Sequence, residues 1–309
     1  MFLSDVHRRV RPVALLAVVA ALALSACAAN KPKPQIAYEE RKPELLYAAG
    51  AERLDHHAWS EAQQYFEEVE RQHPYSEWAR RSVLMTAYAN YEANQYDDAV
   101  AAADRFISLY PGNPSAAYAF YLKAVCYFEQ IVDVGRDQGA TEQALVALRE
   151  VIKRYPQSEY AVDARAKIDL VQDQLAGKEM TVGRYYLRQS LPVAAIGRFK
   201  TVIDRYQTTS HTPEALYRLV EAYLTLGLVD EAKRDGAVLG YNFPGDRWYG
   251  QAYALLTSKG LRPSVEPHKH PDKLLATTTT SPSPAKAKVP EAPKAPAKKG
   301  FFQRLGLGR

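Results

Sequence analysis

Cysteine is scarce in this sequence, and its scarcity excludes two kinds of protein. There are two Cys among 309 residues, Cys27 and Cys126, which stand 99 positions apart. A small domain stapled by disulfides, or a metal site built from thiolates, needs more cysteines at closer spacing. Of the seven His residues, His56 and His57 stand together and His268 and His270 lie near the C-terminus, and neither pair has Cys partners at the spacing of a metal site. We therefore expect no metal ion and no bound cofactor.

An excess of positive charge is missing from the middle of the chain. The net charge is +5, of which residues 1–26 supply +2 and residues 262–309 supply +7, so that residues 27–261 carry −4. A nucleic-acid-binding protein carries its positive charge on its folded face. The distribution therefore argues against a nucleic-acid partner.

Catalytic motifs are absent too. The sequence has no glycine-rich phosphate loop and no Gly-x-Ser-x-Gly motif. Cys126 lies in an aromatic-rich helical stretch, which favours a buried apolar thiol over a nucleophile. Paired acids such as Glu67 and Glu68 belong to segments whose charges recur every fourth residue, as on a solvated helix face. The sequence therefore indicates a protein that is not an enzyme.

Long hydrophobic runs are missing, apart from a short one near the N-terminus. Residues 13–24 are apolar, which is too short for a helix to span a bilayer core of about 30 Å. Three arginines precede this run, as in a secretory signal. The run ends in Leu24-Ser25-Ala26-Cys27, which resembles the bacterial lipobox, where the chain is cut before the Cys and the Cys receives lipid.

This resemblance predicts residues 1–26 to be a lipoprotein signal peptide and Cys27 to be the lipid attachment site. One acyl chain binds a membrane only marginally, whereas two or more give a stable anchor. A plain secretory signal followed by an incidental Cys is the alternative. Ala28 is not the Asp that favours inner-membrane retention in such lipoproteins, so we expect the periplasmic face of the outer membrane. Residues 27–42, rich in Pro and Lys where the mature chain begins, are predicted to form a tether.

The body of the chain is repetitive. Amphipathic segments with apolar residues at i, i+3, i+4 and i+7 end at Pro or a near equivalent. Five alanines stand in register in these segments: Ala62, Ala99, Ala144, Ala195 and Ala232. The pattern resembles the tetratricopeptide repeat, a helix–turn–helix of about 34 residues whose small residues let its two helices cross closely. One unit cannot bury its apolar face alone, whereas five stacked units can. We therefore predict an all-α superhelix of about five such units over residues 43–261.

The intervals between the marker alanines locate two insertions. They are 37, 45, 51 and 37 residues, against the repeat length of about 34. The extra residues predict a loop near 131–141 and a helical addition at 160–176. After residue 261 the pattern stops, and the Pro, Ala and Lys of residues 262–309 predict a disordered basic tail. Its end, Phe301-Phe302-Gln303-Arg304-Leu305, is either idle or a contact for a partner or an anionic membrane.

Together with Gly183-Arg184-Tyr185-Tyr186-Leu187 and residues 237–244, the lipobox, tether and repeats resemble the BamD (ComL) family of outer-membrane assembly factors, of the alphaproteobacterial type. The resemblance covers residues 27 to about 258. It implies a periplasmic scaffold of the β-barrel assembly machine, held to the membrane by its lipid. The implied partners are BamA, docked by the C-terminal repeats, other subunits of the machine, and unfolded outer membrane proteins. The N-terminal repeats would receive the C-terminal targeting segments of those proteins, which typically end in an aromatic residue.

Two sets of residues are candidates for these contacts. The first helices of the early repeats offer an aromatic and apolar slot for an extended peptide, with the candidates Tyr47, Leu54, Leu84, Tyr88, Tyr91 and Leu122. The alternative is that several of these residues pack between repeats. Arg184, Arg188 and Arg198 are candidates for the partner face because they are basic on an acidic body. A solvated face is the alternative for each arginine.

Two other functions fit parts of the sequence. A pilotin-type lipoprotein that escorts secretin subunits shares the lipobox and the repeats, but its units are expected to run nearly contiguously, unlike the 45- and 51-residue intervals here. A cell-wall enzyme on a helical solenoid needs a catalytic domain, which residues 262–309 are too disordered in composition to supply.

Overall fold

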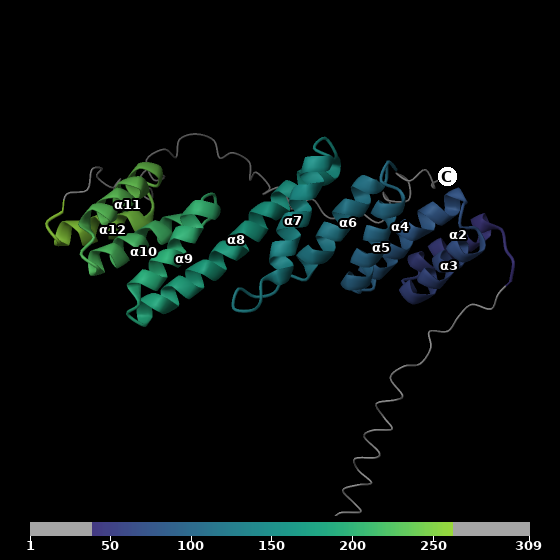
Figure 1. The fold of residues 1–309 in the computed structure, drawn as a ribbon, viewed down its shortest axis with the longest axis horizontal. Coiled ribbons are helices and arrows are strands. Elements are labelled where there is room, and N and C mark those ends of the chain that lie inside the picture. The colour runs from purple at the N-terminus through teal and green to yellow at the C-terminus, as the bar shows by residue number, and fades with distance from the viewer. Residues whose placement is uncertain (1–38, 262–309) are drawn as a thin grey trace, which may run out of the picture. The chain divides into compact units, whose positions relative to one another are not determined.

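The computed structural model describes residues 39–261, and all regular structure in that range is α-helical (Figure 1). The predicted all-α fold class is therefore confirmed. The predicted signal peptide, Cys27, the tether up to residue 38 and the predicted tail lie outside the described residues. Among the helices that are described, none is both long enough and apolar enough to span a bilayer.

Eleven helices make up the described part of the chain. They are α2 (Pro43–Asp55), α3 (Trp59–Gln72), α4 (Glu77–Glu92), α5 (Tyr96–Leu109), α6 (Ala116–Glu129), α7 (Gly139–Arg154), α8 (Glu159–Arg188), α9 (Pro192–Arg205), α10 (Thr212–Thr225), α11 (Val229–Asn242) and α12 (Arg247–Ser258). From α2 to α11 the helices form five consecutive helix–turn–helix units, and α12 follows them. This agrees with the number of units that the alanine register predicts.

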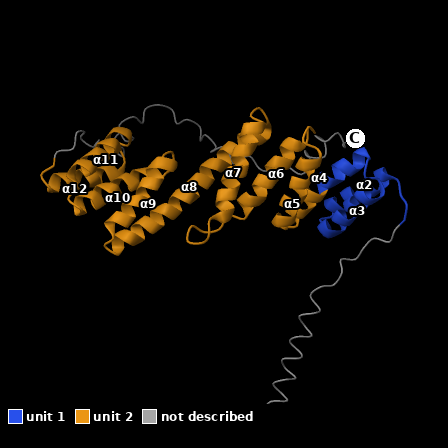
Figure 2. Ribbon diagram, viewed as in Figure 1, with its two compact units in different colours: residues 1–85 blue, residues 86–309 orange. Residues whose placement is uncertain are grey.

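The chain divides into two compact units, residues 1–85 and 86–309, with the boundary inside α4 (Figure 2). In the first unit α2 packs on α3. In the second unit each helix from α5 to α10 packs on the next helix in the chain, and α12 packs on both α10 and α11. Each helix pair of the second unit thereby covers an apolar face of its neighbour, as repeat architectures require.

Small residues stand where the two helices of a repeat cross. The five marker alanines are fully buried, which confirms their register: Ala62, Ala99, Ala144, Ala195 and Ala232. Glycine allows a still closer approach of the first helix to a phenylalanine on the second. A Cβ on Gly50 would lie 2.8 Å from the ring of Phe66, and a Cβ on Gly183 would lie 2.5 Å from the ring of Phe199.

Both predicted insertions are present. The connection between α6 and α7 runs from residue 130 to residue 138, where the sequence predicts a loop. The second insertion lengthens a helix and does not add one, because α8 continues for 30 residues. Ser158 begins α8 as its N-cap by accepting a hydrogen bond from the Ala161 backbone N–H at 3.2 Å.

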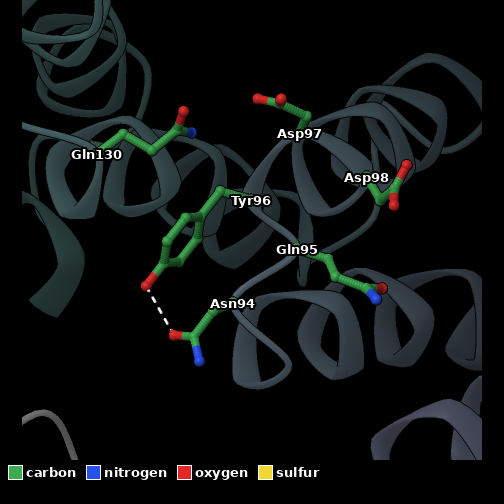
Figure 3. Close-up of a pocket in the computed structure, with 6 residues that line it drawn as sticks. All are labelled: Asn94, Gln95, Tyr96, Asp97, Asp98 and Gln130. Atoms are coloured by element: carbon green, nitrogen blue, oxygen red, sulfur yellow. Dashed lines mark hydrogen bonds between the residues drawn. The ribbon is translucent and has the colours of Figure 1, made fainter. Parts of the chain in front are cut away.

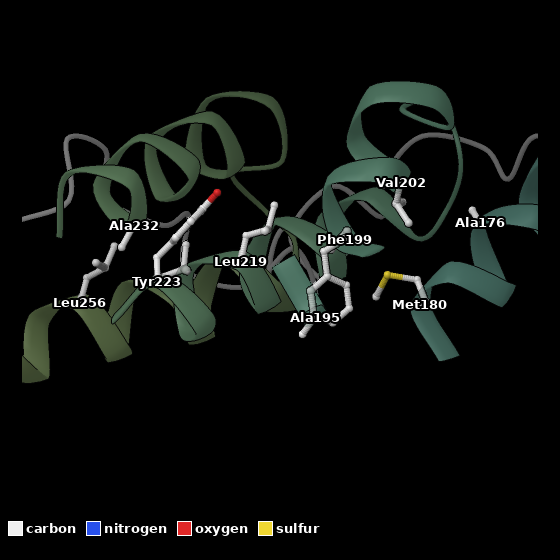
Figure 4. Packing of buried hydrophobic residues seen from close by; sticks show 11 residues of the cluster. Ala176, Met180, Ala195, Phe199, Val202, Leu219, Tyr223, Ala232 and Leu256 are labelled. Atoms are coloured by element: carbon white, nitrogen blue, oxygen red, sulfur yellow. The ribbon is translucent and has the colours of Figure 1, made fainter. Parts of the chain in front are cut away.

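The core of the later repeats is continuous from one helix pair to the next. In Figure 4, Met180 of α8 and Phe199 of α9 lie beside each other. Leu219 of α10 and Leu256 of α12 belong to the same cluster of buried side chains. These side chains are fully buried. Burying a side chain of this size contributes about 1.5–3 kcal/mol, so the apolar contacts between pairs stabilise the array.

Four of the five turns inside the helix pairs place one residue in the left-handed region. The residues and their φ angles are His57 (58°), Asn94 (57°), Ser190 (57°) and Gly227 (75°). Only Gly adopts this conformation without steric cost. The turns at His57 and Ser190 therefore hold local strain that the sequence pattern does not reveal.

Candidate peptide-binding surface

Four of the predicted groove residues are buried. Tyr47, Leu54, Leu84 and Leu122 are 3–4% exposed. The ring of Tyr47 lies 5.4 Å from that of Phe66 and 5.0 Å from that of Trp78, measured between centroids, and burial raises the Tyr47 pKa to about 12. For these four positions the structure favours the packing alternative over an open slot.

The other two predicted groove residues, Tyr88 and Tyr91, are partly exposed on α4. They belong to a larger group of half-buried tyrosines on α4, α6 and α8, all within the second unit. We call this group the tyrosine surface, and it consists of Tyr88, Tyr91, Tyr118, Tyr121 and Tyr160. The ring of Tyr160 lies 5.7 Å from Tyr118 and 5.1 Å from Tyr121, stacked on the latter.

Tyr118 of α6 lies close enough to Tyr88 and Tyr91 of α4 to interact with them electrostatically. Burial raises the pKa of Tyr118 most, and the neighbouring Tyr88, Tyr160 and Tyr91 hydroxyls raise it further. Burial likewise raises the pKa of Tyr121, whose hydroxyl donates a hydrogen bond to Asp163 at 2.6 Å. Burial thus holds these rings in place, and the hydrogen bond to Asp163 fixes Tyr121 as well. Such tyrosines offer an apolar surface that loses little conformational entropy when a ligand binds.

A shallow pocket continues the tyrosine surface at the turn between α4 and α5 (Figure 3). It holds about 350 Å³ and is lined by Asn94, Gln95, Tyr96, Asp97, Asp98 and Gln130. The Tyr96 hydroxyl donates a hydrogen bond to Asn94 Oδ1 at 2.9 Å. The ring of Tyr96 lies 6.0 Å from that of Tyr91, so the pocket and the tyrosine surface are neighbours.

Carboxylates border this region. Asp97 and Asp98 of the pocket and Glu129 at the end of α6 are exposed, and we call these three the acidic rim. Burial raises the pKa of Tyr91 most, and Glu129 is the strongest of the charged neighbours that raise it further. No residue between 39 and 261 forms an ion pair with any member of the acidic rim. The region can therefore receive a ligand that combines apolar or aromatic anchors with positive charge.

Cys126 lies beneath the tyrosine surface and is fully buried, packed with Leu122 in the cluster that Tyr91 and Tyr118 cover. Burial raises the pKa of the Cys126 thiol to about 12. At neutral pH the group is a protonated, inaccessible thiol, and the expectation of a buried apolar cysteine is confirmed. No group of three or more potential metal ligands is found among the described residues.

Two of the three predicted partner-face arginines are engaged within the protein. Arg184 Nε and Nη2 donate to the two carboxylate oxygens of Glu214 at 2.8 and 2.5 Å, joining α8 to α10. Burial opposes ionisation of Glu214, but Arg184 and then Arg218 outweigh it and lower the pKa. Arg198 contacts Glu179 at 3.2 Å. Arg188 is exposed and forms no ion pair with any residue from 39 to 261.

Exposed apolar side chains gather at the turns of the last two helix pairs, and sequence reasoning missed them. At the α8–α9 turn they are Tyr185, Leu191 and Val193, exposed by 51%, 51% and 70%. At the α10–α11 turn they are Leu226 and Leu228, exposed by 39% and 43%. Exposed apolar groups near one another mark a site of protein contact more often than isolated ones do.

Sequence reasoning also missed Tyr118, Tyr121 and Tyr160. The first two had a signal, because Tyr118 stands one helical turn before the candidate Leu122 and Tyr121 stands directly before it on the same helix. Tyr160 had none, because it begins the segment predicted only as an insertion.

Comparison with known proteins finds close relatives. A family model described as an outer membrane lipoprotein, YfiO, matches residues 39–239. The outer membrane protein assembly factor BamD of Caulobacter vibrioides is 63% identical over 295 residues, which cover 96% of this chain and 97% of that protein. The protein of the same name in Rickettsia prowazekii is 48% identical over 211 residues, covering 68% of this chain and 84% of that protein.

Among solved structures, the TPR2AB-domain:pHSP90-complex of yeast Sti1 has a TM-score of 0.40 and 12% identity, covering 71% of this chain and 85% of that one. The assignment of helix–turn–helix repeats rests on the helix pairs and their crossings, described above.

Proposed function

The chain belongs to the YfiO family of outer membrane lipoproteins, and on this basis we propose that it is a lipid-anchored scaffold on the periplasmic face of the outer membrane. Its role is in outer membrane protein assembly, as in the BamD relatives. It contributes binding surfaces to this process and no catalytic group. The relatives reported above are named as assembly factors, and neither as pilotins nor as cell-wall enzymes.

The tyrosine surface is the proposed binding site for client proteins, and its five adjacent half-buried tyrosines are the observation that carries this function. An extended peptide gains affinity from a few apolar or aromatic anchors seated on such a surface. Tyrosine rings accept an aromatic side chain in tilted or stacked contacts. The C-terminal targeting segment of an unfolded barrel protein, ending in an aromatic residue, has this chemistry.

The exposed apolar residues at the α8–α9 and α10–α11 turns, with Arg188 close by in the chain, are the proposed docking site for BamA. A contact of this kind combines an apolar centre with charge at its edge. Arg184 and Arg198 support the docking site from within, because their ion pairs with Glu214 and Glu179 hold helices of the repeats together. The lipid on Cys27 holds the scaffold at the membrane.

A peptide-binding measurement tests the client site. The mature chain without its lipid-bearing Cys27, residues 28–309, is titrated into a fluorescent ten-residue peptide that copies the end of an outer membrane barrel protein and ends in Phe. Replacing Tyr118 or Tyr160 with alanine is expected to weaken binding about tenfold, since each removes an aromatic anchor.

The matched control is Tyr241→Ala, because Tyr241 is 82% exposed and distant in sequence from the tyrosine surface. This variant is expected to bind the peptide as the unchanged chain does. Equal affinity for peptides with and without the terminal Phe would contradict the proposal. So would unchanged affinity in folded Tyr118→Ala and Tyr160→Ala variants.

A further inference from the structure

The tyrosine surface is bordered by negative charge that the folded repeats leave unpaired. The acidic rim supplies three exposed carboxylates that no residue between 39 and 261 pairs with. The whole described part is acidic as well. Residues 27–38 hold two lysines and no acid, so the −4 of residues 27–261 corresponds to −6 for residues 39–261.

The same chain carries a segment with the complementary composition. Residues 285–309 contain seven Lys or Arg and one acid, Glu291, a net charge of +6. Phe301 and Phe302 are the aromatic residues of the sequence after Leu261, and Lys298, Lys299 and Arg304 flank them. An aromatic pair among cations is the ligand chemistry that the tyrosine surface and its acidic rim favour.

The length of chain after the last helix allows this segment to reach the tyrosine surface. Phe301 follows Leu261 by 40 positions, and a chain of that length spans up to about 130 Å when extended. Its root-mean-square span as a flexible chain is about 35 Å. Packed helices lie about 10 Å apart, so the eight steps from α12 to α4, the farthest helix of the tyrosine surface, amount to roughly 80 Å at most.

Covalent connection makes even weak contacts effective. A segment tethered over such a distance is present near the site at an effective concentration on the order of 1 mM. A free peptide with a dissociation constant of about 1 mM would therefore occupy the site half of the time once tethered.

We propose that residues 298–309 dock in cis on the tyrosine surface, with Phe301 and Phe302 on the tyrosine rings and the flanking cations against the acidic rim. The docked segment shields the surface until a client segment displaces it. The displacement rests on the proposed client function, whereas the docking does not.

A photo-crosslinking experiment on the mature chain tests the docking. The photoreactive residue p-benzoylphenylalanine replaces Phe302, and Val289 in the control chain. After irradiation of dilute monomer, we expect crosslinks within one chain from position 302 to α4 or α6, at several times the yield obtained from position 289. Crosslinks elsewhere, equal yields from both positions, or crosslinks only between chains would overturn the proposal.

Two charge reversals then test whether the docking depends on the acidic rim in particular or only on the overall negative charge of the repeats. Glu129→Lys is expected to reduce the crosslinking from position 302 at least threefold. Asp204→Lys, at an exposed carboxylate on α9, is expected to leave it unchanged. Equal effects of the two reversals in folded chains would overturn the specific contact. If the crosslinks vanish when vesicles of anionic phospholipid are added, and position 302 labels the lipid, the segment is a membrane contact and the proposal falls.

Client affinity separates this inference from the proposed function. With the tail substitution Phe301→Ala/Phe302→Ala, the chain is expected to bind the Phe-ended client peptide at least threefold more tightly. Unchanged affinity together with crosslinks off the surface refutes the docking and leaves the client site standing. Crosslinks to α4 and α6 in a chain that binds no client peptide refute the client site and leave the docking standing.

Discussion

Replacing Gly183 with alanine tests whether the helices of a repeat cross as closely as the structure has them. A Cβ at this position would lie 2.5 Å from the ring of Phe199, which is fully buried. Overpacking of this kind costs about 1–3 kcal/mol. Alanine in place of glycine inside a helix returns about 1 kcal/mol. The net expectation is a chain destabilised by about 0–2 kcal/mol.

Gly197 offers a matched control because it lies in α9, where an added Cβ would meet nothing within 4 Å. Gly197→Ala therefore gains only the helix propensity, and we expect stabilisation by about 1 kcal/mol. The two alanine variants should differ by about 1–3 kcal/mol in their free energies of unfolding. Urea denaturation of the mature chain, followed by far-ultraviolet circular dichroism, measures this difference.

A double variant sharpens the test. Phe199→Leu shortens the side chain that the new methyl group meets, so Gly183→Ala should cost about 1 kcal/mol less in the chain that carries Phe199→Leu than in the native one. The reasoning is refuted if Gly183→Ala stabilises the chain as much as Gly197→Ala does. It is also refuted if the effect of Gly183→Ala is the same in both backgrounds.

Three further predictions concern single side chains. Arg184 helps to lower the pKa of Glu214 below its ordinary 4.5. The Glu214 carboxylate therefore stabilises the fold fully above pH 4.5, and this stabilisation is lost as the pH falls through the lowered pKa. In an acid titration, Glu214→Gln should lose less stability than the unchanged chain. Ser190→Gly should stabilise the chain by about 1 kcal/mol in urea denaturation, since φ there is 57°; destabilisation would contradict the turn conformation. Cys126 should resist thiol reagents at pH 8 until urea unfolds the chain, and rapid native labelling would contradict its burial.

Local patterns in the sequence sufficed to predict the helix pairs. The small residue at each crossing and the apolar period of 3.6 are properties of neighbouring residues, so Ala195 could be placed in register without knowledge of the fold. The lengthened helix α8 was foreseen in part, because residues 160–176 keep the helical period but do not indicate where the helix ends. The left-handed residues in the turns were not foreseen, since three of the four are not glycine.

The candidate site depends on contacts that spacing does not encode. Tyr118 and Leu122 stand one turn apart on α6, yet Leu122 is buried and Tyr118 is half-buried. Which of them faces a neighbouring repeat depends on how the helix pairs cross. The ion pair of Arg184 is equally hard to predict from spacing, because its partner Glu214 follows 30 residues later on another helix. The sequence therefore indicates a partner face for Arg184, whereas the structure shows its ion pair with Glu214.

Affinity purification of the full-length chain from detergent-solubilised envelopes tests whether the protein is a scaffold for outer membrane protein assembly. We expect a barrel protein with repeated periplasmic domains to co-purify in nearly equal amount, and we expect replacement of the exposed Leu191 and Val193 with Asp to remove it. Recovery of a secretin or of cell-wall proteins, with no such barrel protein, would contradict the account and leave only the fold.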